Sequence, residues 1–465
     1  MEPITIQEIM DAVHGRLLGE FDGLEQTVTQ VEIDSRTIHE GSLFIPLVGE
    51  RFDGHAYIGS ALEKGAAGCL TARERESYLP GKFYIKVDST QNALRDLARY
   101  YKEKFHIPFI GITGSVGKTT TKDMIAAVLS QKYHVLKTEG NYNNEVGLPL
   151  TLLRLDHTYE IGVLEMGMNH FGEIDYLSSI VEPKVAVITN IGDAHIENLG
   201  SRENILKAKS EIFAHMKQDT LTVLNGDDPL LLTLKGTLPM KTVFCGRNEG
   251  CDYRASGLSG DGSTHIFCQV KTPCMDCKME IPSLGEHMIY PALMATAVGE
   301  HFGLTQQEIL DGVMQFAPTK MRMNLLNRAD GITILDDTYN ANPQSMRAAV
   351  GVLANMKGDY KVAVLGDMFE LGSLSAALHT GVGEYAGKAG LSCVIAIGDM
   401  AKHIYEAAKE NGVPEAYYCK TKDEALPLLE KAVRPGAVIL CKASRGMGFE
   451  TIVAELKKLT DDAAE

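Results

Sequence analysis

The chain lacks any long hydrophobic run. None of its apolar stretches, across 465 residues, reaches the roughly 18 residues that a membrane-spanning helix requires. The first five residues, Met1 to Thr5, also lack the positively charged start and the apolar core of a secretory signal. We therefore expect a cytoplasmic protein with no membrane span.

An excess of positive charge is also missing. The chain carries 45 Lys and Arg against 61 Asp and Glu, which gives a formal net charge of −16. This balance argues against nucleic acid or an anionic membrane as the main partner. A local basic pocket could still bind phosphate groups.

The cysteines do not form a regular framework. There are nine, an odd number, scattered along the chain, and without an export signal we expect them to be reduced thiols. Cys274 and Cys277 form a lone C-x-x-C pair with no second pair at zinc-finger spacing. An ordinary loop or strand is favoured there over a metal site.

The texture of the sequence divides the chain into three blocks, consistent with about three domains for this length. Residues 1–103 mix short strand-like runs with helices, for example at 7–13 and 56–64. Residues 104–318 alternate strands and helices, which indicates a mostly parallel sheet, and 241–283 read as an antiparallel edge of it. Residues 319–465 show a second βαβ array of the size of a Rossmann-like domain. The predicted fold class is three-domain α/β.

The most specific motif follows the predicted strand at 107–113. It is a glycine-rich turn that opens a helix at Lys118, the context in which backbone N–H groups bind phosphate. The Lys118 ammonium can reach the β- and γ-phosphates, and the Thr119 hydroxyl can hold Mg²⁺. Ile112 stands where the usual pattern has its first glycine, so the loop is a variant. A plain strand-to-helix turn is the alternative. The expected loop residues are Thr113, Gly114, Ser115, Val116, Gly117, Lys118, Thr119 and Thr120.

Two further strands deliver polar side chains to the same predicted crevice. Glu165 ends one strand, where a carboxylate could bind Mg²⁺, and Asn190 and His195 follow the next. The alternatives are a surface acid for Glu165 and a structural role for His195.

With these residues together, the chain resembles the Mur ligase family, ATP-dependent amide-forming enzymes of bacterial peptidoglycan synthesis. The resemblance covers essentially the whole chain and implies catalytic roles for Lys118, Glu165, His195 and Lys209. It implies a carbamate on Lys209, although Lys209 read alone would be a solvated lysine on a helix face. One Mg²⁺ would use Thr119 and Glu165, and a second would use His195 and Lys209. The ATP contacts implied beyond the loop are Asn190, His287, Arg322 and Asp336.

Other segments resemble those of the family members that add D-alanyl-D-alanine. They include Asp336 to Met346 and Leu365 to Gly372. The resemblance then implies that UDP-N-acetylmuramoyl-tripeptide and D-alanyl-D-alanine are joined through an acyl phosphate. We expect the enzyme to be a monomer. Residues implied for the UDP substrate are Ser35, Arg36, His55, Asn141, Asn143 and Asn144. Weaker candidates for the dipeptide are Tyr339, Asn340, Asn342, Ser444 and Arg445.

Some readings stay open. Met288 and Pro291 stand where the family usually carries asparagines that help to bind adenine, and Pro291 suits only the first turn of a helix. Arg322 could form a hinge salt bridge, Asp336 a helix cap, and Asn340 and Asn342 a turn. The alternative functions are a related ligase that adds a single amino acid, a P-loop ATPase, and a non-catalytic binding module.

Overall fold

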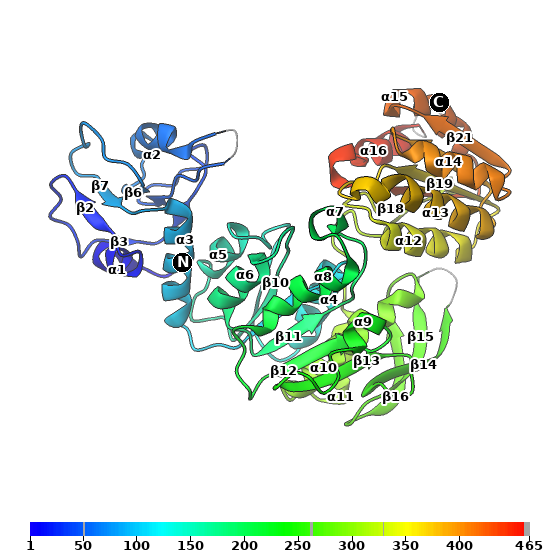
Figure 1. Cartoon of the computed structure of the whole chain (residues 1–465), viewed down its shortest axis with the longest axis horizontal. Coiled ribbons are helices and arrows are strands. Elements are labelled where there is room, and N and C mark those ends of the chain that lie inside the picture. Colours follow the sequence, from blue (N-terminus) through cyan, green and yellow to red (C-terminus); the bar gives the residue numbers. More distant parts are fainter. Residues whose placement is uncertain (50–51, 261–263, 329, 460–465) are drawn as a thin grey trace.

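The computed structural model describes residues 1–49, 52–260, 264–328 and 330–459. Its strands form three main sheets in chain order, and the three parts lie one after another along the molecule (Figure 1). Among the described residues, no helix combines the length and the apolar character needed to cross a membrane.

The first part is built on a five-stranded sheet of order β2-β7-β6-β5-β4, in which only β2 runs antiparallel to its neighbour. A small separate pair joins β1 to β3. The helices expected at 7–13 and 56–64 are present as α1 and as η1 with α2. The elements are β1 (Ile4–Thr5), α1 (Ile6–Ala12), β2 (Arg16–Leu18), β3 (Thr27–Val28), β4 (Val31–Glu32), β5 (Leu43–Phe44), η1 (Gly54–Tyr57), α2 (Ile58–Glu63), β6 (Gly68–Thr71), β7 (Phe83–Lys86) and α3 (Thr90–Glu103).

The central part is built on a nine-stranded sheet of order β16-β15-β14-β13-β12-β11-β8-β10-β9. The strands are β8 (Phe109–Thr113), β9 (Val135–Lys137), β10 (Ile161–Glu165), β11 (Val185–Ile188), β12 (Leu221–Asn225), β13 (Lys241–Gly246), β14 (Tyr253–Gly260), β15 (Ile266–Lys271) and β16 (Asp276–Ile281). Pairing is parallel from β9 to β14, and β15 and β16 continue the sheet in antiparallel fashion to its edge. The predicted antiparallel edge is thus confirmed for the last three strands, whereas β13 still pairs in parallel with β12.

Helices cover both faces of this central sheet. They are α4 (Lys118–Leu129), α5 (Gly147–Leu152), α6 (Glu173–Val181), α7 (Ile196–Leu199), α8 (Arg202–Ser210), η2 (Glu211–Phe213), α9 (Pro229–Leu232), η3 (Glu286–Met288), α10 (Ile289–His301) and α11 (Gln306–Met314). Every residue of β8 is buried, and its side chains alternate between two cores. Phe109 lies in the core under α6, and Ile110 lies in the core under α4 and α10. Burial on both faces leaves the carboxyl ends of the strands as the open edge for chemistry.

The last part is a six-stranded sheet of order β17-β18-β22-β19-β20-β21, parallel except for the edge strand β17. The elements are β17 (Asn324–Asn327), β18 (Thr333–Asp336), α12 (Pro343–Asn355), β19 (Tyr360–Gly366), η4 (Gly372–Leu374), α13 (Ser375–Lys388), β20 (Cys393–Ile397), α14 (Ala401–Glu410), β21 (Glu415–Cys419), α15 (Lys422–Ala432), β22 (Ala437–Lys442), η5 (Arg445–Met447) and α16 (Glu450–Lys458). The four strands expected in this block are confirmed as β18, β19, β20 and β22.

The linker between α11 and β17 has an unusual backbone. Met321 and Met323 both take positive φ, at 63° and 51°, a conformation that costs a non-glycine residue roughly 1–2 kcal/mol. Hydrogen bonds from the last part stabilise it, because the Tyr339 N–H donates to the Met321 carbonyl (3.1 Å) and the Met323 N–H donates to Asp337 Oδ1 (3.2 Å).

All nine cysteines lie in the described residues and are unpaired there. Cys274 is exposed before β16 and Cys277 lies on that strand, so the pair stands on a loop and a strand.

Candidate active site

The loop between β8 and α4 has the backbone of a phosphate cradle. Gly114 takes φ 148°, and a Cβ atom built on it would lie 1.9 Å from Thr189 Oγ1, so the loop requires glycine there. Gly117, at φ 83°, precedes the first residue of α4, which places the N-terminus of that helix at the loop. The Lys118 ammonium folds back and donates to the Gly114 carbonyl (2.9 Å). A plain turn would need none of these features.

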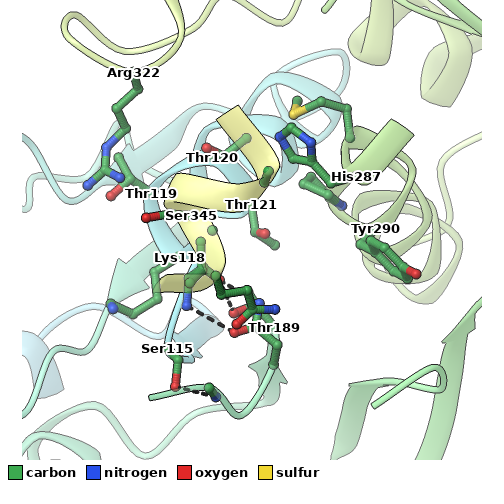
Figure 2. A pocket seen from close by; sticks show the side chains of 18 of the residues that line it. Ser115, Lys118, Thr119, Thr120, Thr121, Thr189, His287, Tyr290, Arg322 and Ser345 are labelled. Atoms are coloured by element: carbon green, nitrogen blue, oxygen red, sulfur yellow. Dashed lines mark hydrogen bonds between the residues drawn. The ribbon is translucent and has the colours of Figure 1, made fainter. Parts of the chain in front are cut away.

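The neighbouring strand β11 holds the loop in place. Thr189 Oγ1 donates to the Val116 carbonyl (2.6 Å), and the Asn190 amide bonds the Val116 N–H (3.0 Å) and carbonyl (2.9 Å). The Gly192 N–H donates to Ser115 Oγ at 2.8 Å (Figure 2). Asn190 was expected to contact ATP. In the structure both polar atoms of its side chain bond the loop, and Asn190 also lines the cavity described below, so the ATP contact stays a prediction.

Glu165, at the end of β10, lies beside the start of α4. Its side chain is 2% exposed, so the surface-acid alternative is wrong. Thr119 Oγ1 donates to one carboxylate oxygen and Asn143 Nδ2 to the other, both at 2.8 Å. The structure therefore brings together the two expected ligands of the first Mg²⁺, and it adds Asn143, which was expected on the UDP substrate.

Two lysines approach this cluster, Lys118, which is half-buried, and Lys209, which is buried. Burial lowers the pKa of Lys118. The charge of Glu165 partly offsets this shift, and the charge of Arg322 lowers the pKa further. Lys209 on α8 is only 1% exposed, so the reading of a solvated helix face is wrong. Burial, and secondarily the Lys118 charge, lower the pKa of Lys209 well below its usual value. A lowered pKa favours the neutral amine, which is the form of lysine that reacts with carbon dioxide.

His195 lies at the border of the central and last parts of the chain. It precedes α7 with φ 63°, and its Nδ1 lies 2.7 Å from Oε2 of Glu370, on the loop after β19. The Glu197 N–H donates to the Glu370 carbonyl (3.4 Å). Proximity to His195 lowers the pKa of Glu370. Within the described ranges, no group of three or more His, Cys, Asp or Glu side chains is arranged to hold a metal ion.

A cavity of about 570 Å³ opens between the phosphate loop and the last part of the chain, within the size range of small-molecule sites. It contains most of the residues expected at the nucleotide. From the central part it is lined by residues that include Ser115, Lys118, Thr119, Glu165, Asn190, Asp227, His287 and Tyr290, and from the linker and the last part by Arg322, Asp337, Asn340, Asn342, Ser345 and Lys442.

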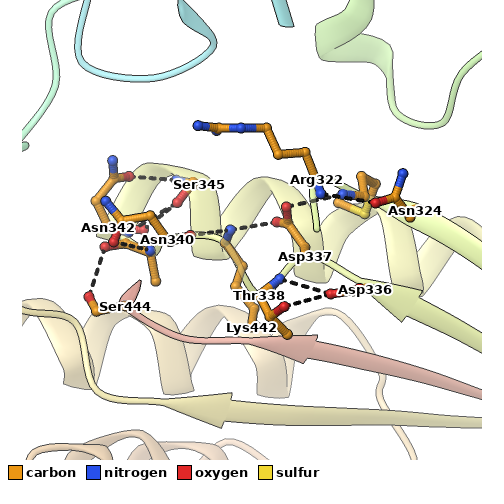
Figure 3. Close-up of polar contacts among 12 residues, drawn as sticks. Arg322, Asn324, Asp336, Asp337, Thr338, Asn340, Asn342, Ser345, Lys442 and Ser444 are labelled. Atoms are coloured by element: carbon orange, nitrogen blue, oxygen red, sulfur yellow. Dashed lines mark hydrogen bonds and ion pairs between the residues drawn. The ribbon is translucent and has the colours of Figure 1, made fainter. Parts of the chain in front are cut away.

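Arg322 enters this cavity from the linker, and its guanidinium lies over the ring of Tyr339 at 4.2 Å. Asp336 does not line the cavity. Its carboxylate accepts from the Thr338 hydroxyl (2.6 Å) and so stabilises the following turn, whereas the N-cap of the next helix, α12, is Asn342 and not Asp336. The next residue, Asp337, lines the cavity and forms an ion pair with Lys442 (Figure 3). Sequence analysis missed Asp337, although neighbouring residues at a strand end point in opposite directions.

The dipeptide candidates have mostly structural contacts. Asn342 caps α12 by accepting from the Ser345 N–H (2.9 Å), which supports the turn reading, and Asn340 accepts from the Ala341 N–H (2.9 Å). Ser444 is 3% exposed and accepts from the Phe369 N–H (2.9 Å). Arg445 is exposed and pairs with Glu450.

The candidates for the UDP substrate do not line the cavity. Asn143 reaches it indirectly, through its hydrogen bond to Glu165, which does line the cavity. His55 is 6% exposed, with Nδ1 at Asp53 (2.7 Å) and Nε2 accepting from the Ala72 N–H (2.9 Å), so both ring nitrogens are occupied. Arg36 is exposed and pairs with Asp34 (2.6 Å). Asn144 accepts from the Gly147 N–H (2.8 Å), and Ser35 is half-buried while Asn141 is exposed.

The far end of the cavity contains the departures from the family pattern. Pro291 lies in the first turn of α10, as expected for a proline. Tyr290 donates to Asp227 Oδ2 (2.9 Å), and both residues line the cavity near His287. No sequence motif marked Tyr290 or Asp227.

A phosphate loop on one parallel sheet faces the polar edge of a second sheet across a single cavity, and this defines a multidomain nucleotide-dependent enzyme. Three family models match the chain in order. They are "Mur ligase family, catalytic domain" over residues 27–102, "Mur ligase middle domain" over 112–299, and "Mur ligase, glutamate ligase domain" over 321–445. The chain belongs to the Mur ligase family.

Individual relatives agree along nearly the full length. A protein of Bacillus subtilis named UDP-N-acetylmuramoyl-tripeptide–D-alanyl-D-alanine ligase is 39% identical over 97% of this chain and 98% of its own. The crystal structure of MurF from Acinetobacter baumannii has a TM-score of 0.91 at 33% identity, covering 98% and 99% of the two chains. MurF of Thermotoga maritima, in complex with ADP, has a TM-score of 0.83 at 30% identity, covering 93% and 98%. The expected family and three-domain α/β fold are confirmed.

Proposed function

We propose that this chain is an ATP-dependent ligase that joins D-alanyl-D-alanine to UDP-N-acetylmuramoyl-tripeptide, giving the pentapeptide precursor of peptidoglycan with ADP and phosphate. The observation that carries the proposal is similarity over almost the entire chain to ligases of that name. The cavity that joins the phosphate loop to the last sheet supports it. We place the enzyme in the cytoplasm, as a monomer.

The proposed domains follow the sequence blocks. Residues 1–103 bind the UDP-muramoyl substrate, residues 104–318 bind ATP, and residues 319–465 close on ATP and bind the incoming dipeptide. The ends of the linker support this division, because Phe316 is buried in the central core and Leu325 packs on the core of the last part.

The chemistry has two steps. The terminal carboxylate of the tripeptide attacks the γ-phosphorus of ATP, forming an acyl phosphate and releasing ADP. The amine of D-alanyl-D-alanine then attacks the acyl carbon, and phosphate leaves with the electron pair of the C–O bond. Negative charge concentrates in the first step, where Lys118 and Arg322 face the cavity. Loss of one such preorganised charge commonly costs on the order of 10²–10³ in rate.

The residues present fit Mg²⁺ at one position. The Thr119 hydroxyl and the Glu165 carboxylate, 2.8 Å apart and buried, supply the oxygen ligands that this ion prefers. When bound, the ion would neutralise charge on the phosphate oxygens. For a second ion the candidates are His195 and Lys209, the latter after its amine has become a carbamate and thus an oxygen donor.

A coupling assay tests the proposal. The full chain is incubated with ATP, Mg²⁺, UDP-N-acetylmuramoyl-tripeptide and D-alanyl-D-alanine, and the mass of the product is measured by mass spectrometry. We expect the mass of the tripeptide and dipeptide joined with loss of water, and oxygen-18 from the tripeptide carboxyl in the released phosphate.

The control omits D-alanyl-D-alanine, or replaces it with single amino acids. Amide formation with lysine, diaminopimelate or glutamate alone would contradict the choice of substrate. Phosphate release that needs neither substrate would indicate an ATPase, and intact ATP binding without any product would indicate a binding module. Tripeptides ending in lysine and in diaminopimelate are both supplied.

A further inference from the structure

A buried carboxylate ties the phosphate-loop helix to the linker between the second and third domains. Asp123 lies on α4, after the phosphate loop, and is only 6% exposed. One of its oxygens lies 3.1 Å from the Lys122 ammonium and 2.9 Å from that of Lys137. The other accepts a hydrogen bond from the hydroxyl of Thr319. The helix that carries Lys118 is thereby joined directly to the linker.

The charges around Asp123 keep this acceptor ionised. Burial alone would raise the pKa of Asp123, but Lys122, the Thr319 hydroxyl and Lys137 together hold it below the usual value. Lys122 is itself buried and donates to the Thr138 carbonyl (2.7 Å). The acceptor therefore stays in one place, which is the property that an anchor for a linker requires.

Thr319 in turn sets the path of Arg322. The Arg322 N–H donates to the Thr319 carbonyl (3.2 Å), which closes a turn between the two residues. The Arg322 side chain then runs into the nucleotide cavity (Figure 2). Its guanidinium lies over the ring of Tyr339. Its Nε atom is buried and has no hydrogen-bond partner among the residues that the structure describes, so it remains available to a ligand.

The linker needs such an anchor because its backbone is strained. Met321 and Met323, on either side of Arg322, both take the left-handed conformation that side chains other than glycine seldom adopt. Conformations of this kind persist where the surrounding contacts enforce them.

We propose that Asp123 is a positioning residue: through Thr319 it fixes the linker so that Arg322 meets the nucleotide opposite Lys118. The proposal rests on the proposed function only in taking ATP as the ligand of the cavity. It predicts that the Asp123–Thr319 contact raises the affinity for ATP only by positioning Arg322, so that the contact has no effect on affinity when the Arg322 side chain is absent.

A double-mutant cycle tests this in the full chain. Affinity for ATP with Mg²⁺ is measured by calorimetry for Thr319→Val, Arg322→Ala and the double variant, with Thr319→Ser as the matched control that keeps the hydroxyl. We expect Thr319→Val to weaken binding about fivefold, the worth of one hydrogen bond, and Thr319→Ser to stay near the wild type. The double variant should bind no more weakly than Arg322→Ala alone.

If the losses of ATP affinity in Thr319→Val and Arg322→Ala multiply in the double variant, the proposal is wrong. It is also wrong if either single variant binds ATP as tightly as the wild type. Asp123→Asn weakens the same contact from the other side, and it should likewise leave ATP affinity unchanged in a chain that already carries Arg322→Ala. Thermal unfolding of each variant shows that the fold is kept. Because binding is measured without amide formation, a chain that binds ATP in this way but makes no product would sink the proposed function and leave this inference standing.

Discussion

Lys209 shows what burial does to a single side chain. Lysine is almost never fully buried without a charged partner, yet this one is 1% exposed and its pKa is lowered by burial and by Lys118. Burial thus favours the neutral amine, the form that can be converted into a carbamate and so into an oxygen ligand. The proposed carbamate would give Lys209 a role that no charge pattern in the sequence could reveal.

We expect Lys209→Ala to lose at least about 10² in ligation rate, in line with the loss of one electrostatic element of a phosphoryl-transfer site. A short carboxylic acid added to the assay should partly restore the rate by supplying the missing oxygens. The matched control is Lys207→Ala on the same helix, since that side chain is exposed and should be replaceable. Initial rates from the coupling assay, with and without added acid, provide the measurement. A Lys209→Ala enzyme as fast as the wild type would remove the carbamate from the mechanism.

At the scale of residues, sequence reasoning found the groups that belong to a local motif and missed those that depend on direction. Lys118, Thr119 and Glu165 were predictable because a loop and a strand end carry them to one edge. Asp336 was chosen over Asp337, a difference of one residue that reverses the side chain's direction. His55 carries polar chemistry but is buried with both nitrogens bonded, which only tertiary packing determines.

Among the elements, the loop between β8 and α4 depends on two glycines for different reasons. A Cβ on Gly114 would collide with Thr189, whereas a Cβ on Gly117 would meet open space and suffer only from its positive φ. Gly114→Ala should therefore displace the loop from β11.

We predict that Gly114→Ala weakens ATP binding by more than about 10²-fold, since the loop and the base of Lys118 must move. Gly117→Ala should weaken it by roughly tenfold, because a left-handed alanine costs about 1–2 kcal/mol. Calorimetry with ATP and Mg²⁺ on both variants checks the order. Equal losses in the two variants would mean that the contact with Thr189 does not shape the site.

Most elements were predictable because their signals are local. Buried parallel strands such as β8 and β10 read as short, mostly apolar runs that each contain one glycine, and α4 follows β8. The edge strands β17 and β21 gave no such signal, since β17 is only partly buried and its sequence, Asn324 to Asn327, begins and ends on a polar residue. Both pair with a strand next to them along the chain, β17 with β18 and β21 with β20, so the weak signal lies in their own sequences and not in a distant partner.

On the scale of the whole molecule, His195 and Glu370 connect the second and third domains. The contact between Nδ1 and the carboxylate leaves Nε2 of the same ring for another role, an arrangement frequent for histidines that bind metals. The loop that carries Glu370 is in turn held by Ser444, through the Phe369 N–H. The position of the third domain is therefore coupled to the orientation of His195.

We expect Glu370→Ala to speed amide hydrogen exchange at α7 and to lower the ligation rate by a few-fold, because a partly exposed contact between a histidine and a carboxylate is worth at most about 1 kcal/mol. Glu370→Gln is the matched control, since its amide oxygen can still accept from Nδ1–H. Exchange followed by mass spectrometry on the full chain gives the readout. Identical protection of α7 in Glu370→Ala and the wild type would show that the contact does not hold the two domains together.

The outermost strand of the central sheet has a consequence for the behaviour of the protein in concentrated solution. An open sheet border can recruit a border from another molecule and start aggregation. On β16 the charged residues Asp276, Lys278 and Glu280 alternate with Cys277 and Met279, so a second copy would have to dehydrate charges of both signs in order to extend the sheet. This strand thereby helps to keep neighbouring copies apart in a crowded cell.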